Sequence, residues 1–461
     1  MSTTHLKINF RENAIKALQD SSLREAMRTA TETFAEKRAQ GLASLPIEEW
    51  RDRGSAIRLQ VIDNLAFYVD RFAASATREG AVVHRAKDAQ TARETVLNIL
   101  KDRGARKVVK AKSMVTEEIR LNDHLEAGHL EVIETDLGEY IVQIAGEHPS
   151  HILAPAIHKN RQQVGRLFAD KLGVDYSEDP EVLTKIARQI LRKEFLTADA
   201  GISGANFAVA DTGSLVLFTN EGNGRMVTTL PKLHVAVISL EKIIPSLADL
   251  AVFVRLLPRS ATGQPLSSYL SVVTGPKKTG EVTGAEEVHI VVVDNGRTRI
   301  VSGECREILK CIRCSACMNV CPVYKAVGGH AYASTYPGPM GIVLTNALEG
   351  LNKGYPLLDA TTLCGACADV CPVRVPLVDL IRRLRERAVR EGYTSDTEKM
   401  AMAAFGIAAS HPALFNWARK TSRLTWPLLS SLVKNSPVKR MPRPAQEIFT
   451  EGFARRNTTT R

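Results

Sequence analysis

Residues 311–322 read CIRCSACMNVCP, and residues 361–372 read TTLCGACADVCP. The first stretch has the complete spacing of a bacterial ferredoxin run, with cysteines at 311, 314, 317 and 321 and a proline at 322. In such a run, three cysteines hold one iron–sulfur cluster and the fourth, before the proline, holds the neighbouring cluster. The stretch therefore predicts an α-helical, ferredoxin-like module with two clusters.

The second stretch has one cysteine fewer than the first. It supplies Cys364, Cys367 and Cys371, but Thr361 stands where a fourth cysteine would be expected. Exchanging the last cysteines of the two runs gives a first [4Fe–4S] cluster on Cys311, Cys314, Cys317 and Cys371, and a second on Cys321, Cys364 and Cys367. A zinc ribbon, which closes one tetrahedral site with two Cys-x-x-Cys pairs, fits this spacing poorly.

The missing ligand of the second cluster has several candidate replacements. Cys305, six residues before the first run, could fold back, although a buried, unligated thiol is the more ordinary role for such a cysteine. Thr361, Thr362 or His330 could ligate instead. The site could also stay open at one iron, as a three-iron cluster or with an exchangeable ligand, and an open iron could bind a substrate hydroxyl or carboxylate.

Composition and charge indicate the cellular location of this module and the partners that it can bind. All eight cysteines lie between positions 305 and 371, which favours metal binding over scattered disulfides. The N-terminus has no apolar signal region, and the chain has no long uncharged apolar run, so we expect a cytoplasmic location. From position 373 onward, 17 Lys and Arg face 7 Asp and Glu. This basic tail favours an acidic partner or, at most, peripheral membrane contact, and it lacks a nucleic-acid recognition motif.

The remaining sequence predicts an α/β protein of several domains, as expected for 461 residues. Residues 1–79 have helical periodicity, and residues 80–302 alternate strands and helices in the manner of a parallel sheet. Strands are expected in AVVHRA, KVVKAKS, LEVIETD, FAVADTG, SLVLFTN, HVAVISL, YLSVVTG and HIVVVDN. The cluster domain is expected at 303–394 and a basic helical tail at 395–461.

One Gly-rich segment of the α/β region has the features of a ligand site. GISGAN and TNEGNGR flank two strand-like runs, and the polar residues Asn220, Glu221, Asn223 and Arg225 gather at a predicted strand end. RSATGQPLSSY, at 259–269, could line the same pocket. His148, His151 and His158 lack a matching acidic or cysteine ligand, which favours structural roles over zinc. The chain has neither a Walker loop nor a complete dinucleotide fingerprint.

The motifs HPSHILAPAIHK, ISGANFAVADTGSLVLFTNEGNGRMVTTLPK and CIRCSACMNVCPVYKAVGGHAYASTYPGPMG resemble the lactate utilization protein B family over nearly the whole chain. The resemblance implies a LUD domain, similar to the ribose-phosphate isomerase and CoA-transferase superfamily, followed by the two-cluster module. It implies a subunit of an NAD-independent complex that oxidises L-lactate to pyruvate. It further implies two companions, a cysteine-rich-repeat subunit and a second LUD-domain subunit. In this family the seven cysteines of the two runs are the ligands, and Cys305 is outside the pattern.

The residues themselves indicate electron transfer as the role of this chain, because two adjacent one-electron clusters can pass on singly the two electrons of a 2-hydroxy acid. The catalytic residues and the electron acceptor are not identified by the sequence. Two other functions stay open. The chain could be a general two-cluster carrier for another 2-hydroxy-acid or glycerol-phosphate dehydrogenase. The LUD domain could also be an enzyme in its own right, with structural clusters.

Overall fold

The computed structural model describes residues 8–43, 45–433 and 453 of the 461-residue chain. The chain divides into two compact units, residues 1–385 and 386–461. The first unit contains the whole α/β region and both cysteine motifs. The predicted boundaries at 79/80 and 302/303 fall inside it and stay predictions.

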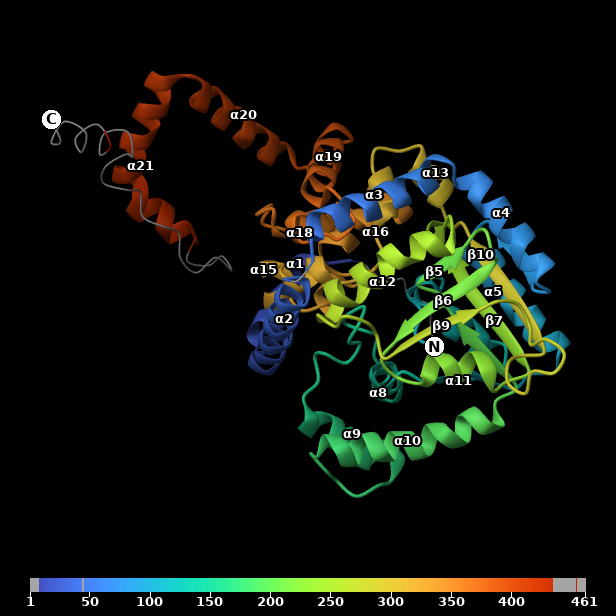
Figure 1. Cartoon of the computed structure of the whole chain (residues 1–461). Coiled ribbons are helices and arrows are strands. Elements are labelled where there is room, and N and C mark those ends of the chain that lie inside the picture. Colours follow the sequence, from blue (N-terminus) through green and yellow to red (C-terminus); the bar gives the residue numbers. More distant parts are fainter. Residues whose placement is uncertain (1–7, 44, 434–452, 454–461) are drawn as a thin grey trace. The chain divides into compact units, whose positions relative to one another are not determined.

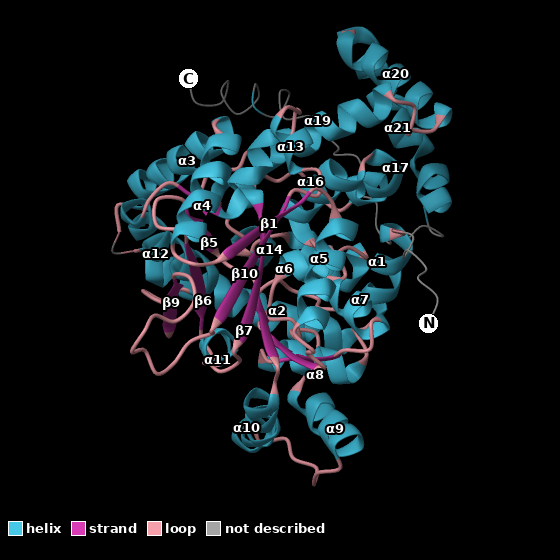
Figure 2. Cartoon of the chain, turned by 90° about the vertical axis from the view of Figure 1, so that its right-hand side faces the viewer, coloured by secondary structure: helices cyan, strands magenta, loops and turns pink. Residues whose placement is uncertain are grey.

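A six-stranded, wholly parallel sheet lies at the centre of the first unit (Figures 1 and 2). Two of its inner strands, Leu233–Ser239 and Glu287–Val293, are buried on both faces, which is why they read as nearly continuous hydrophobic stretches. In order across the sheet, the strands are β1 Val82–Ala86, β10 Glu287–Val293, β7 Leu233–Ser239, β4 Ala200–Ser203, β2 Lys107–Lys110 and β3 Glu131–Glu134. This sheet confirms the predicted α/β class.

A second sheet of four strands differs from the expectation of a single parallel sheet. Its order is β8 Ile243–Ile244, β5 Phe207–Val209, β6 Ser214–Thr219 and β9 Tyr269–Val273. β5 and β6 form an antiparallel hairpin, and β9 pairs antiparallel with β6. Gly213 turns the hairpin at φ +69, where an added Cβ would lie 2.3 Å from the backbone nitrogen of Ala76. This short turn leaves no room for the crossover that parallel pairing requires.

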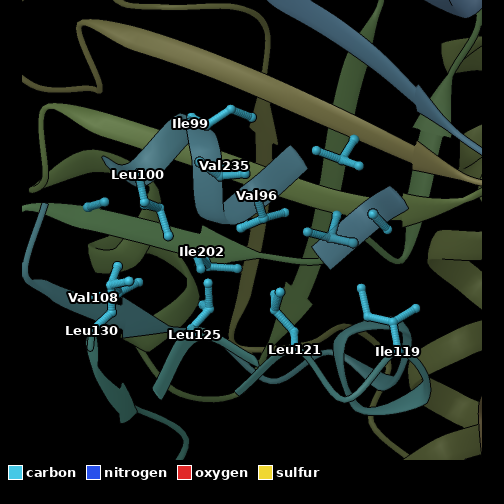
Figure 3. Packing of buried hydrophobic residues seen from close by; sticks show 14 of the residues in the cluster. Val96, Ile99, Leu100, Val108, Ile119, Leu121, Leu125, Leu130, Ile202 and Val235 are labelled. Carbon is cyan, nitrogen blue, oxygen red and sulfur yellow. The ribbon is translucent and has the colours of Figure 1, made fainter. Parts of the chain in front are cut away.

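Helices cover both faces of the parallel sheet. On one face, α5 Ala89–Asp102, α6 Met114–Glu118 and α7 Leu121–Ala127 bury a cluster that includes Val96, Leu100, Leu125, Ile202 and Val235 (Figure 3). On the other face, the second sheet and the helix α4 Leu65–Arg78 pack against Ala236, Ile238 and Ile290. The remaining helices of this region are α8 Leu137–Ala145, α9 Arg161–Leu172, α10 Pro180–Thr197, α11 Asn223–Thr229, η1 Leu240–Lys242 and α12 Leu247–Thr262.

The predicted helical N-terminal segment forms four helices, drawn in blue in Figure 1: α1 Phe10–Gln19, α2 Ser21–Leu42, α3 Ile47–Asp63 and α4 Leu65–Arg78. They bridge the two parts of the first unit. α2 contacts α12 of the α/β region as well as α14 Ala316–Asn319 and α15 Pro322–Val327 of the cysteine region. α3 contacts both α12 and the 3₁₀ helix η2 Arg306–Lys310. The cysteine motifs therefore share a packed interface with the α/β region.

The cysteine region consists of short helices joined by tight turns. They are α13 Arg297–Val301, η2 Arg306–Lys310, α14 Ala316–Asn319, α15 Pro322–Val327, η3 His330–Tyr332, α16 Gly338–Glu349, α17 Leu351–Gly354, η4 Tyr355–Asp359, α18 Ala366–Asp369 and α19 Leu377–Arg390.

The second unit bears out the helical part of the predicted basic tail. It contains α20 Asp396–Ser410 and α21 Pro412–Val433. Apart from residue 453, the tail beyond 433 lies outside the described residues. In the part of the chain that the structure describes, no helix combines the length and the apolar character needed to cross a membrane.

Candidate metal centre

The two cysteine motifs adopt the same backbone conformation fifty positions apart, from 311 to 361. Arg313 and Ser315, on either side of Cys314, have φ values of 60 and 62, while Leu363 and Gly365, on either side of Cys364, have 54 and 92. Each motif then enters a four-residue helix, α14 or α18, and ends at a Cys-Pro pair. Such left-handed residues are costly outside glycine, so the repetition indicates that both loops are shaped around a similar group.

The seven motif cysteines form two adjacent groups. In the first group, Cys311 and Cys371 lie close enough to Cys314 to raise its pKa electrostatically. Cys311, Cys314 and Cys371 together raise the pKa of Cys317 in the same way. In the second group, Cys367 has Cys321 and Cys364 as neighbours. Cys367 also raises the pKa of Cys317 electrostatically, which places the two groups next to each other. In this grouping, the last cysteine of each motif lies with the cysteines of the other motif, and the assignment of all seven as cluster ligands stays a prediction.

The first group surrounds a small enclosed cavity with apolar walls, formed by Ile308, Met340 and Val375 among others. Burial, followed by the neighbouring Cys311 and Cys371, raises the pKa of Cys314 to about 12. Thiols of this kind ionise readily only when a metal compensates their charge. Backbone N–H groups already face the sulfurs: Arg313 donates to Cys311 Sγ at 3.4 Å and Val375 to Cys371 Sγ at 3.2 Å. The donors and the cavity fit an iron–sulfur cluster.

Among the described residues, no three His, Cys, Asp or Glu side chains converge on one ion-sized position. None of the eight cysteines is in a disulfide.

The second group lies closer to solvent. Cys364 is exposed, whereas Cys321 and Cys367 are buried. Hydrogen bonds from the Thr362 hydroxyl and the Ala366 N–H lower the pKa of Cys364. A group held here would thus have one exposed corner, in contrast to the enclosed first group.

Thr361 occupies the position of the missing cysteine in geometry as well as in sequence. Its Oγ1 accepts a hydrogen bond from the N–H of Leu363 at 3.1 Å. In the first motif, Cys311 Sγ accepts the equivalent bond from Arg313. The Thr361 hydroxyl therefore accepts, from the N–H two residues downstream, the hydrogen bond that a ligating thiolate would accept.

The other candidate ligands have different surroundings. Cys305 is buried directly before η2, which packs against α3, α13 and α16. His330 shares a hydrogen bond with the carbonyl oxygen of His148 at 2.7 Å.

The predicted histidines have structural partners. His151 is buried, accepts bonds from the N–H groups of Leu153 and Ala154, and contacts Asn319 on α14 at 3.2 Å. Burial lowers the pKa of His151 to about 4, so its ring is neutral. His158 pairs with Glu147 at 2.7 Å.

Three arginines of the N-terminal helices hold the cysteine loops in place. Arg38 donates to the carbonyl of Val370 at 2.9 Å, and Arg51 donates to the carbonyl of Cys371 at 2.9 Å. Arg58 is 1% exposed and donates to four carbonyls, those of Lys310, Leu309, Ile243 and Glu241. These contacts span 183 to 332 positions of sequence, so helical periodicity alone could not reveal them.

A buried ion network joins the cysteine region to the α/β region. Glu241 pairs with Arg297 at 2.5 Å and with Arg313 at 3.0 Å, and Arg297 also pairs with Glu118 at 2.7 Å. Burial alone would raise the pKa of Glu241, but the guanidinium groups of Arg297 and Arg313 outweigh burial and hold that pKa at about 2. Arg313, between Cys311 and Cys314, thus fixes the first cysteine loop against the sheet.

A cleft of about 270 Å³ adjoins this network. It lies beyond the carboxyl ends of β7, β4, β2 and β3, four neighbouring strands, where ligands bind in open α/β sheets. The residues that follow these strands and line the cleft include Lys242, Asn206, Lys112 and Asp136. Arg313 and Tyr336 of the cysteine region line it too, so the cleft reaches the first cysteine loop.

The predicted ligand residues largely line this cleft. Asn220, Glu221 and Asn223 do so, whereas Arg225 is exposed on α11 outside the lining. Partial burial, with the neighbouring carboxylate of Asp136, raises the pKa of Glu221 to about 7. From the 259–269 loop, Gln264 and Ser267 line the cleft, as expected.

Sequence analysis did not identify Lys242 or Arg313 as lining residues. Lys242 follows a strongly hydrophobic strand, and this position could have identified it as a residue that lines the cleft. Because Arg313 lies within the first cysteine motif, its position in the sequence gave no signal that it also lines the cleft.

Comparisons with known proteins agree with this architecture. The LUD domain model matches residues 69–293, and the 4Fe-4S dicluster domain model matches residues 307–375, which indicates iron–sulfur clusters. Lactate utilization protein B of Bacillus subtilis (strain 168) is 44% identical over 470 residues, covering 98% of this chain and 97% of its own. Its counterpart in Lysinibacillus sphaericus (strain C3-41) is 46% identical over 438 residues, covering 94% and 91%. A solved DUF162 family protein from Deinococcus radiodurans, 15% identical, covers 50% of this chain and 98% of its own, with a TM-score of 0.28.

Proposed function

Because the chain belongs to the lactate utilization protein B family, we propose that it is the iron–sulfur electron-transfer subunit of a complex that oxidises L-lactate to pyruvate. The observation that carries the proposal is the pair of adjacent cysteine groups, one enclosed and one with an exposed corner, joined through Cys317 and Cys367. An enclosed group next to a surface group is the arrangement an electron carrier needs between a donor and an acceptor.

The proposed cofactors are two [4Fe–4S] clusters, which would accept and release one electron each. The ligands would be Cys311, Cys314, Cys317 and Cys371 for the first and Cys321, Cys364 and Cys367 for the second. The protein itself supplies N–H groups to the sulfurs and buried arginines near the first group. Positive charge and hydrogen bonds near a cluster favour its reduced form, so these residues would raise the potential of the first cluster.

Growth tests this function. A strain lacking the gene is expected to fail on L-lactate as the sole carbon source. The wild-type gene should restore growth, and a Cys367→Ala gene should not. Equal loss of growth on glycolate or glycerol phosphate would instead indicate a general electron carrier.

The complex would contain two companions, a cysteine-rich-repeat subunit and a second LUD-domain subunit, and would lie in the cytoplasm. The exposed Cys364 supports an exit for electrons at the protein surface, towards one of these subunits or another acceptor. The absence of disulfides among the eight cysteines supports a reducing compartment.

Thr361→Cys is expected to complete the second site. The new thiol would lie at the position of the Thr361 hydroxyl, which now accepts a hydrogen bond from the Leu363 N–H. A fourth thiolate would hold the last iron more firmly. In the wild type, brief oxidation should release that iron and produce a three-iron electron paramagnetic resonance signal. The variant should give little of this signal.

Thr184→Cys, at an exposed position of α10, is the matched control for the added thiol. It should behave like the wild type. An undiminished three-iron signal in Thr361→Cys would contradict the assignment.

A further inference from the structure

The cleft beside the first cysteine group contains polar groups that the protein leaves unused. Nη1 of Arg313 is buried without a hydrogen-bond partner, although Arg313 is only 6% exposed. Oδ1 of Asn223, which is 5% exposed, is also without a partner. Nζ of Lys242 forms no hydrogen bond or ion pair with the residues that the structure describes. All three residues line the same cleft.

The protein's own carboxylates leave Nη1 of Arg313 and Nζ of Lys242 without a partner among the described residues. Glu241 is engaged by Arg297 at 2.5 Å and by Nη2 of Arg313 at 3.0 Å. Asp136 is paired with Lys112 at 3.3 Å. A buried charged donor without a partner costs free energy, and such groups persist where a ligand completes them.

Arg313 lines the cleft with a guanidinium that is held in place on two sides. The Glu241 carboxylate holds one side of the guanidinium, and the Tyr336 ring lies 5.1 Å from its central carbon. Tyr336 is itself fixed, because its hydroxyl donates to Glu118 at 2.6 Å. A donor fixed in this way recognises an oxyanion with little loss of side-chain entropy.

We infer that this cleft binds the carboxylate of a small organic acid through Arg313 and Lys242. Asn223 supplies an acceptor for a hydroxyl group of a ligand in the same cleft. Two cations suit any oxyanion, phosphate included, and the choice of a carboxylate rests on the proposed function. The volume of about 270 Å³ suits a small molecule better than a dinucleotide.

The position of Arg313 gives the inference a second, independent consequence. The residue lies between Cys311 and Cys314, so a bound anion would add negative charge beside the first cysteine group. Negative charge disfavours the reduced form of a cluster. Ligand binding should therefore lower the midpoint potential of the enclosed cluster.

Isothermal titration calorimetry on the anaerobically purified full-length protein tests the inference, with L-lactate, pyruvate and inorganic phosphate as separate titrants. Lys242→Met removes one cation without breaking an ion pair. Lys185→Met, on an exposed position of α10, is the matched control for the loss of a lysine. We expect saturable binding of at least one carboxylate. Lys242→Met should weaken it about tenfold or more, because a charge-assisted hydrogen bond is lost, and Lys185→Met should leave it unchanged.

Three results would overturn the inference: no saturable binding of either carboxylate, equally tight binding by Lys242→Met, or binding of phosphate alone. Iron content and the electron paramagnetic resonance spectrum are measured on the same samples. If these are intact in a protein that binds no carboxylate, the inference fails while the electron-transfer function stands. If the iron is absent, the proposed function fails first.

Discussion

Cys314→Ala is expected to remove about half of the bound iron, leaving about four irons of about eight per chain. Cys314 is buried in the first group, whose cavity has mostly apolar walls that offer few groups to replace a lost thiolate. Iron and acid-labile sulfide, measured on anaerobically purified protein, report this loss directly.

Cys305→Ala is the matched control for the loss of a buried thiol. Cys305 and Cys314 are both buried, but Cys305 lies outside the two motifs. Its iron content should equal that of the wild type. If Cys305→Ala loses as much iron as Cys314→Ala, the ligand set proposed for these clusters is wrong.

Glu241→Gln is expected to destabilise the protein by about 3 to 5 kcal/mol, since it removes the shared partner of two buried arginines. Glu241, in η1 of the α/β region, is 1% exposed and pairs with Arg297 of α13 and with Arg313 of the first cysteine loop. The variant should unfold at lower urea concentration and lose iron more quickly during the titration, because the cysteine loop would lose its attachment to the sheet.

Glu286→Gln is the appropriate comparison. Glu286 forms ion pairs with Lys232 and Lys277 at the surface, where water screens the charges, so little change in the unfolding midpoint is expected. If the two variants unfold at the same urea concentration, the buried network does not stabilise the junction as argued.

The local features of the metal centre could be predicted from the sequence because they depend on short-range spacing. Three-residue steps between Cys311, Cys314 and Cys317 define which sulfurs can face one group. The run HIVVVDN predicted a strand, and it supplies most of β10, which pairs in parallel with β1 and β7. The grouping of Asn220, Glu221 and Asn223 could be predicted because, in open α/β sheets, ligands bind beyond the carboxyl ends of the strands.

Features that depend on distant partners could not be predicted in this way. Arg58 lies in an amphipathic helix, where a charged residue suggests a solvent-facing position, but it is buried because the carbonyls around Lys310 and Glu241 converge on it. β5 and β6 have the same β-rich pattern as parallel strands, and only the short turn at Gly213 separates them into a hairpin. Lys242 and Arg313 come from different regions of the chain, and both line the cleft.

The most direct test of the central claim is the metal content of the wild-type protein, purified without oxygen and examined by electron paramagnetic resonance after reduction. The account predicts about eight irons and about eight acid-labile sulfides per chain, with signals from two clusters close enough to interact magnetically. Zinc without iron, or about four irons with the signal of a single isolated cluster, would contradict it.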